Sequence, residues 1–122
     1  MASSSKKIIG KIGEKIALQY LQNKGYQFIE KNFYCRFGEI DLIFKKNEKI
    51  IFVEVKTRIG EKKGKPYEAI NFYKLQDLKR AINFYLLKKN YFHYKLSLEV
   101  VSVILNSDLS LKEIKHFSEL FI

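Results

Sequence analysis

The amino-acid sequence predicts an α/β fold, with a mixed central sheet flanked by helices and the element order αβββαβ. Two segments repeat apolar residues at the spacing of amphipathic helices, and the other segments alternate apolar and polar residues or are continuously apolar, as strands do. With 122 residues, 47% of them hydrophobic, and one proline, the chain can bury a core and is too apolar for a disordered protein. We therefore expect one domain over residues 1–122.

The first helix is expected at residues 6–24, after a polar terminus (residues 1–6) that we expect to be mobile. The helix carries an apolar stripe, which consists of Ile9, Ile12, Ile16 and Tyr20. Gly25 follows as a left-handed cap, since glycine adopts positive φ at low cost. A short strand is expected at residues 26–29, and a further extended segment at residues 33–37.

A β-hairpin is expected next, with strands at residues 38–45 and 49–58 joined by the turn-prone residues 46–48. Residues 59–66 form a basic, glycine-punctuated loop. The hairpin and the loop together place charged residues immediately after an apolar strand.

The second helix is expected at residues 72–89. The strand at residues 96–105 is apolar on both faces, which favours a position inside the sheet. After a turn, residues 112–117 predict an edge strand. Aromatic residues at helical and strand spacing, among them Phe52, Phe84 and Tyr85, are expected in the core, although base-stacking positions could be among the 8 Tyr and 10 Phe.

The chain is strongly basic, with 23 Lys and Arg residues against 13 Asp and Glu residues and a formal charge of +10. Such a charge attracts polyanions, of which nucleic acid is the commonest. A basic protein from an AT-rich genome is the alternative, so the charge is supporting evidence only. One cysteine, Cys35, excludes an internal disulfide and fits the cytoplasm. No apolar run approaches the roughly 20 residues of a membrane span, so we expect no membrane partner.

Three charged residues lie inside two adjacent strand-like runs. Asp41 follows Ile40, and alternation puts Glu54 and Lys56 on one face of the next strand. Charges inside strands are costly to desolvate unless they are paired or bind metal. Two carboxylates can hold Mg²⁺ or Mn²⁺, and a lysine beside them can orient water or neutralise phosphate. The alternative is a structural ion pair, but two acids and one base leave a net negative pocket that a cation would fill.

Other residues near these strands carry weaker signals. Glu39 shares a strand face with Asp41 and fits a supporting acid or an exposed side chain equally well. The basic residues after the second hairpin strand are predicted to clamp phosphate, in preference to a merely solvated loop; they are Arg58, Lys62, Lys63 and Lys65. His93 and His116 have no partner at ligand spacing and are expected at the surface.

Several short motifs follow one another in a specific order and spacing: Gly13-Glu14, Gly25-Tyr26, Asn32, residues 37–43, residues 52–58, residues 68–70 and Lys74. In this order they resemble the YraN-like family of predicted endonucleases, in the PD-(D/E)-x-K nuclease superfamily and related to archaeal Holliday-junction resolvases. The resemblance covers residues 10–117. It implies a restriction-endonuclease-like fold and makes Glu14 a site residue where position alone favours a solvated side chain. Lys74 also matches the family pattern and could contact phosphate, with an exposed lysine as the alternative. One departure is Glu99, where the family pattern has Asp.

We therefore expect a cytoplasmic, Mg²⁺- or Mn²⁺-dependent endonuclease that acts on DNA, with branched or damaged DNA and a homodimer as further suggestions of the resemblance. Asp41 and Glu54 would hold the metal with the help of Glu14, and Lys56 would serve the water or the scissile phosphate. Two alternatives stay open: a nucleic-acid-binding module without catalysis, and an interaction subunit of a repair or processing complex. A pure binder gains nothing from anionic groups that face phosphate, which favours the enzyme.

Overall fold

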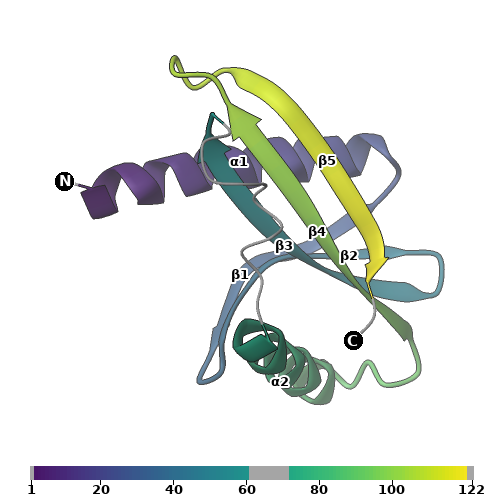
Figure 1. Cartoon of the computed structure of the whole chain (residues 1–122). Coiled ribbons are helices and arrows are strands. Elements are labelled where there is room, and N and C mark those ends of the chain that lie inside the picture. The colour runs from purple at the N-terminus through teal and green to yellow at the C-terminus, as the bar shows by residue number, and fades with distance from the viewer. Residues whose placement is uncertain (1, 61–71, 121–122) are drawn as a thin grey trace.

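The computed structural model describes residues 2–60 and 72–120, and side chains within residues 5–60 and 73–118. The elements of this described part follow one another as α1 (Ala2–Asn23), β1 (Gln27–Cys35), β2 (Gly38–Lys46), β3 (Lys49–Ile59), α2 (Phe72–Lys89), β4 (Lys95–Leu105) and β5 (Leu111–Leu120) (Figure 1). This is the predicted order αβββαβ with the predicted edge strand added at its end.

The five strands form one mixed sheet in the order β1-β2-β3-β4-β5. β3 and β4 are parallel, and the other neighbouring strands are antiparallel. A parallel pair needs a long crossover connection, and the chain from β3 to β4 contains α2. β4 is buried from Ser97 to Leu105, as expected for an apolar strand inside a sheet.

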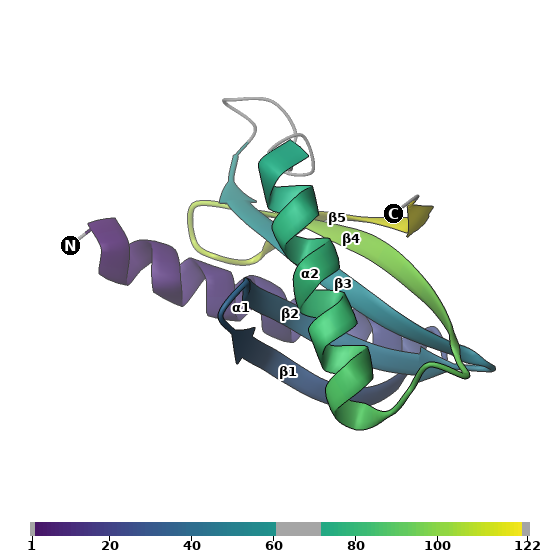
Figure 2. The same ribbon diagram turned by 90° about the horizontal axis from the view of Figure 1, so that it is seen from below.

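The two helices cover opposite faces of the sheet (Figure 2). On one face, α2 packs through Leu78, Ile82 and Tyr85 against residues such as Ile43 and Phe52. On the other, α1 packs against a second cluster, which includes Ala17, Leu21, Leu42, Val53, Val55 and Val101. The predicted restriction-endonuclease-like core, a mixed sheet flanked by helices, is therefore confirmed.

Element boundaries differ from the prediction mainly near the N-terminal third of the chain. α1 begins at Ala2, inside the terminus that was expected to be mobile. β1 is one strand, where two extended pieces with a gap were predicted. The polar residues that interrupted the pattern lie on a strand at the edge of the sheet, where polar side chains reach solvent, and Asn32 adopts a left-handed φ of 51° there.

Turn chemistry sets the ends of several elements. Gly25 has a φ of 91°, and its N–H and that of Tyr26 donate to the carbonyls of Gln22 and Leu21, which closes α1. Asn47, with a φ of 56°, turns the chain from β2 into β3. No helix in the described ranges is long and apolar enough to cross a membrane.

The core predictions hold for most of the named aromatic residues. Phe52 and Tyr85 are fully buried, and His93 is exposed as predicted. Phe84 was expected in the core, but its side chain is 39% exposed. Its neighbour Tyr85 takes the position that faces the sheet, and consecutive helical residues point about 100° apart.

Candidate metal centre

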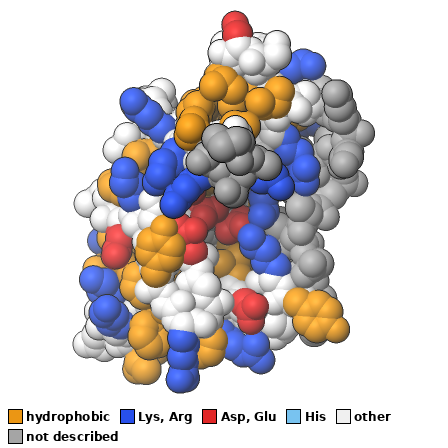
Figure 3. All heavy atoms as spheres, turned by 90° about the vertical axis from the view of Figure 1, so that its left-hand side faces the viewer, with side chains coloured by type: hydrophobic (Ala, Val, Ile, Leu, Met, Phe, Trp, Pro, Cys, Tyr) orange, Lys and Arg blue, Asp and Glu red, His pale blue; other side chains and the backbone are white. Residues whose placement is uncertain are grey.

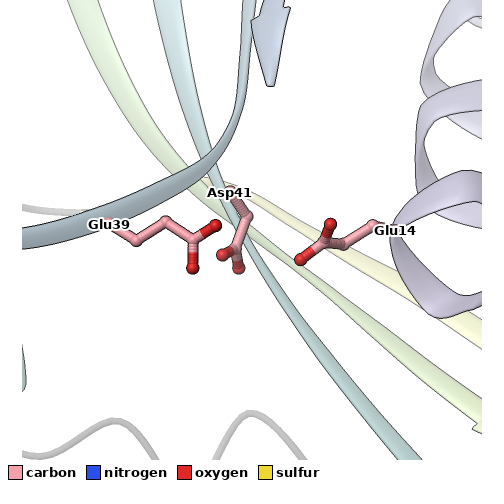
Figure 4. A group of neighbouring side chains, drawn as sticks. All are labelled: Glu14, Glu39 and Asp41. Atoms are coloured by element: carbon pink, nitrogen blue, oxygen red, sulfur yellow. The ribbon is translucent and has the colours of Figure 1, made fainter. Parts of the chain in front are cut away.

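Three carboxylates from two elements converge beside the sheet. Glu14 comes from α1, and Glu39 and Asp41 come from β2. One oxygen of each lies within 4.8 Å of the others, and Figure 4 shows the three side chains turned toward one another. Hard oxygen ligands at this separation match the requirements of Mg²⁺ or Mn²⁺, so the donor set fits a divalent cation.

The close approach of α1 to the sheet depends on Gly13, the residue before Glu14. A Cβ at Gly13 would overlap the side chain of Thr57 on β3, including its Cβ at 2.7 Å. Only glycine therefore allows the helix to pass this close to the strand. The resulting contact brings Glu14 within reach of Asp41.

Asn32 fixes the relative positions of two of the three carboxylates. Its side-chain amide donates hydrogen bonds to Glu14 Oε1 at 3.1 Å and to Glu39 Oε2 at 2.6 Å. Asparagine tolerates the left-handed backbone found here better than most residues. Although Asn32 was part of the resemblance, its role was not predicted from the sequence; an isolated Asn inside a strand pattern was the available signal.

Asp41 is the most strongly perturbed acid of the group. Its side chain is 9% exposed, and its Oδ2 accepts a hydrogen bond from the Val55 N–H at 2.8 Å. Burial, followed by the negative charge of Glu54, raises the pKa of Asp41 to about 8. Burial likewise raises the pKa of Glu14, against the opposing hydrogen bond from Asn32. Burial removes the water that would stabilise the ionised forms of both carboxylates, and the neighbouring acids add to this effect.

Glu54 lies beside this group and is neutralised by two lysines. Its side chain is buried, and Oε2 lies 2.7 Å from Lys74 Nζ and 3.3 Å from Lys56 Nζ. Burial and the nearby Lys74 lower the pKa of Lys56. Burial also disfavours the charge on Lys74, but the hydrogen bond and the attraction to Glu54 outweigh it and raise the pKa of Lys74.

Two adjoining hollows of about 460 and 620 Å³ meet at these side chains, and Asp41, Glu54 and Lys74 line both. The smaller hollow also contains Phe37, Glu39 and Asp77, and the larger contains Glu14. Further cations line the larger hollow, namely Lys6, Lys56 and Arg58. Figure 3 shows acidic side chains in the hollow and basic side chains around its rim. The site is therefore an anionic centre with a cationic surround.

The structure brings most of the predicted site residues to these hollows. Asp41 and Glu54 share both of them, and Glu14, Lys56, Arg58 and Lys74 line the larger one. Lys74, predicted to contact phosphate, pairs with Glu54. Within the described residues, Arg58 Nε is buried and has no hydrogen-bond partner. Glu39, for which two interpretations were open, lies in the carboxylate group.

Part of the predicted phosphate clamp cannot be placed on this surface. Lys62, Lys63 and Lys65 lie outside the residues that the structure describes. The cationic rim, in the described part of the chain, is made of residues from α1, β3 and α2.

A second buried acid, Glu99 on β4, has very different surroundings. Its carboxylate accepts hydrogen bonds from the Tyr26 hydroxyl at 2.8 Å and the Ser97 hydroxyl at 3.0 Å, and His116 Nε2 lies 2.6 Å from it. Lys24 Nζ donates to His116 Nδ1 at 3.1 Å, so Nε2 carries the ring proton that Glu99 accepts. Burial alone would raise the pKa of Glu99, but these hydrogen bonds lower it.

The environment of His116 differs from the prediction. It was expected at the surface, but its side chain is 5% exposed. The ring packs edge-on against Tyr20 and Tyr26. The prediction was wrong because partners far apart in the sequence, which spacing cannot reveal, surround this residue of the edge strand.

Comparison with known proteins identifies relatives along almost the whole chain. It is 42% identical over 122 residues to a UPF0102 protein of Caldanaerobacter subterraneus subsp. tengcongensis, covering 99% of this chain and 100% of the relative. It is 45% identical over 114 residues to a UPF0102 protein of Clostridium botulinum, covering 90% and 93%. A UPF0102 protein of Syntrophomonas wolfei is 41% identical over 113 residues, covering 93% and 96%.

A family model matches residues 13–103, a span that includes Glu14, Glu39, Asp41 and the two lysines that pair with Glu54. That model is described as uncharacterised protein family UPF0102. The chain belongs to the UPF0102 family.

Proposed function

We propose that the protein is a metal-dependent endonuclease of the PD-(D/E)-x-K superfamily, which hydrolyses phosphodiester bonds in nucleic acid, with DNA as the expected substrate. The observation that carries this proposal is the convergence of Glu14, Glu39 and Asp41 within 4.8 Å, with Asp41 buried and its pKa raised to about 8. Desolvated carboxylates of this kind are stabilised by a divalent cation.

The side chains of the site divide the work between metal binding and substrate handling. Glu14, Glu39 and Asp41 would hold the cation, and Glu54 would join them from β3. Bound Mg²⁺ or Mn²⁺ would polarise a phosphoryl oxygen and make a water molecule more acidic. Lys56, whose Nζ is held 3.3 Å from Glu54, orients the attacking water or neutralises charge on the phosphate. Asn32 is a positioning residue that keeps the Glu14 and Glu39 carboxylates in place.

The charge around the centre supports a polyanionic substrate. The larger hollow combines three acids with four cations, Lys6, Lys56, Arg58 and Lys74. The Arg58 side chain lines the larger hollow, where its guanidinium can pair with a phosphate oxygen. With a formal charge of +10, the protein would draw nucleic acid to a centre whose own acids repel it unless a cation is bound.

The proposal is tested with purified protein and single-stranded, duplex and branched DNA, in Mg²⁺, Mn²⁺ or EDTA. Cleavage is expected in the metals and not in EDTA. Asp41→Asn, Glu54→Gln and Lys56→Ala should each abolish it with the fold intact by circular dichroism. Lys95→Ala, at the exposed start of β4, is the matched control and should cleave normally. Absence of cleavage on all three substrates in both metals would contradict the enzymatic function.

The cationic rim favours a second candidate, a nucleic-acid-binding module without catalysis. Such a module would bind DNA with steep salt dependence, unaffected by EDTA or by Asp41→Ala. An endonuclease should instead bind more tightly when the metal neutralises its carboxylates. An interaction subunit of a repair complex would bind no nucleic acid at all. For each of these functions we propose that the protein is cytoplasmic. We also propose a homodimer, which size-exclusion chromatography with light scattering would detect.

A further inference from the structure

The end of the β1–β2 hairpin lies at the rim of the carboxylate group. Tyr34 is directly opposite Glu39 in the antiparallel ladder, so the two side chains lie on the same face. The negative charge of Glu39 is the largest cause that raises the pKa of Tyr34, and Glu14 and Asp41 add to it more weakly. The phenol therefore lies beside the acids.

The ring of Tyr34 is open to solvent. The residue is 71% exposed, one of the most exposed large hydrophobic residues of the described chain. An exposed aromatic ring beside this site offers a face on which another flat group can stack.

The hairpin end also contributes to the smaller hollow. Phe37 and Gly38 line it together with Asp41 and Glu54. Phe37 packs against the core under α2, and the Arg36 guanidinium lies 4.8 Å from the centre of its ring. An exposed aromatic face such as that of Tyr34, next to a phosphate-cleaving centre, is a group on which unpaired bases stack.

We propose, building on the nuclease function above, that Tyr34 stacks on an unpaired nucleobase next to the scissile phosphate, so that the substrate is nucleic acid with unstacked bases at the cleavage point. Bases in an uninterrupted duplex present only their edges, whereas single strands and branch points present faces. Tyr34 is thus a specificity-determining residue, while the carboxylates act on the backbone common to all forms.

The test compares wild type, Tyr34→Ala and Tyr34→Phe for binding to a single-stranded oligonucleotide and to the duplex of the same sequence, in Ca²⁺ and in EDTA. Base–aromatic stacking is worth about 1–3 kcal/mol per base, so Tyr34→Ala should weaken single-strand binding by roughly 5- to 150-fold. Duplex binding should stay nearly unchanged. Tyr34→Phe, which keeps the ring, should retain most of the single-strand affinity.

Two further measurements sharpen the test. A 2-aminopurine in the single strand should lose fluorescence on binding to wild type and Tyr34→Phe, and less on binding to Tyr34→Ala. Phe92→Ala is the matched control, because Phe92 is 58% exposed and lies beyond the C-terminal end of α2, whereas Lys74 is near its start. It should behave like wild type.

The outcomes separate this inference from the nuclease function. The stacking role would be overturned if Tyr34→Ala lost equal affinity for the single strand and the duplex, or lost no affinity at all. Failure of the wild type to bind either oligonucleotide would overturn it too. A protein that cleaves DNA but shows equal losses would keep its proposed activity and lose this inference. Selective single-strand loss without any cleavage would support the stacking role and contradict the nuclease.

Discussion

Asp41 and Glu99 are both acids buried in the sheet, 9% and 3% exposed, and they differ in what surrounds them. Glu99 has three side-chain partners that donate hydrogen bonds, and its pKa is lowered. Asp41 accepts one backbone N–H and faces other carboxylates, and its pKa is raised to about 8. A buried charge with a full set of donors serves the fold, whereas one held among like charges calls for a ligand.

The largest difference should appear in metal binding. Asp41→Asn removes the central carboxylate charge and should bring Mn²⁺ binding below detection in titration calorimetry. Glu99→Gln changes the other buried acid and should bind Mn²⁺ as wild type does. Equal loss in both variants would mean that binding depends on global integrity of the fold, and the comparison between the two acids would fail.

The pH dependence of stability should have opposite signs for the two acids. Because the native pKa of Asp41 is about 8 against the ordinary 3.8, the folded state binds this proton more tightly, and the free energy of unfolding should fall as the pH rises between these values. Each unit of pKa difference is worth about 1.4 kcal/mol, so the fall amounts to several kcal/mol. Mg²⁺ should reduce this fall in the free energy of unfolding.

Glu99 should act in the other direction. Its pKa lies below the ordinary 4.5, so its contribution is complete above that pH and is lost as the pH falls through the lowered value. Urea denaturation of metal-free protein across this range measures both effects. Asp41→Asn should flatten the fall toward pH 8 and leave the acid limb in place; an unchanged profile would refute the assignment to Asp41.

Substitution at neutral pH should also distinguish the two acids. Glu99→Gln replaces an acceptor of three hydrogen bonds and should cost about 2 kcal/mol of unfolding free energy, since hydrogen bonds to charged groups are worth roughly 1.5–3 kcal/mol. With a pKa of about 8, the Asp41 carboxyl is mostly protonated at neutral pH in the metal-free protein, so Asp41→Asn exchanges one neutral acceptor of the Val55 N–H for another and should have little effect. A larger destabilisation from Asp41→Asn than from Glu99→Gln in urea denaturation would reverse this interpretation.

A further comparison concerns the two glycines of α1, of which Gly10 should have the smallest effect on stability. Gly13→Ala would overlap Thr57 and should destabilise the protein by about 1–3 kcal/mol, typical of overpacking, and weaken Mn²⁺ binding by displacing Glu14. Gly10→Ala has no atom within 4 Å of its new Cβ and should stabilise the helix by up to about 1 kcal/mol. Thermal melts measure the stability of both variants, and calorimetry measures their Mn²⁺ binding. If both substitutions changed the stability in the same direction, the close contact at Gly13 would be unimportant.

Local patterns predicted the elements near the site well. The bounds of α2 and of the β2–β3 hairpin agree with the prediction to within a residue or so, because periodicity and turn residues are local signals. Alternation also places Glu54 and Lys56 on one face, and they form an ion pair. These features need no knowledge of the rest of the chain.

Contacts across the fold were beyond that reach. Glu14 became a site residue only through resemblance, because its position depends on how closely Gly13 lets α1 approach β3. The bridge from Asn32 to two carboxylates and the burial of His116 against Glu99 join residues from different elements. Hydrophobic spacing carries no information on such pairs, so they appear only when the helices are placed on the sheet.

The most direct test is a crystal soaked in Mn²⁺ and measured for anomalous scattering. A peak at coordination distance from Asp41, shared with Glu14 or Glu39, is expected, with no peak beside Glu99. Manganese that binds elsewhere, or a soaked crystal in which Asp41 has no metal neighbour, would contradict the view that this buried carboxylate is built to hold a cation.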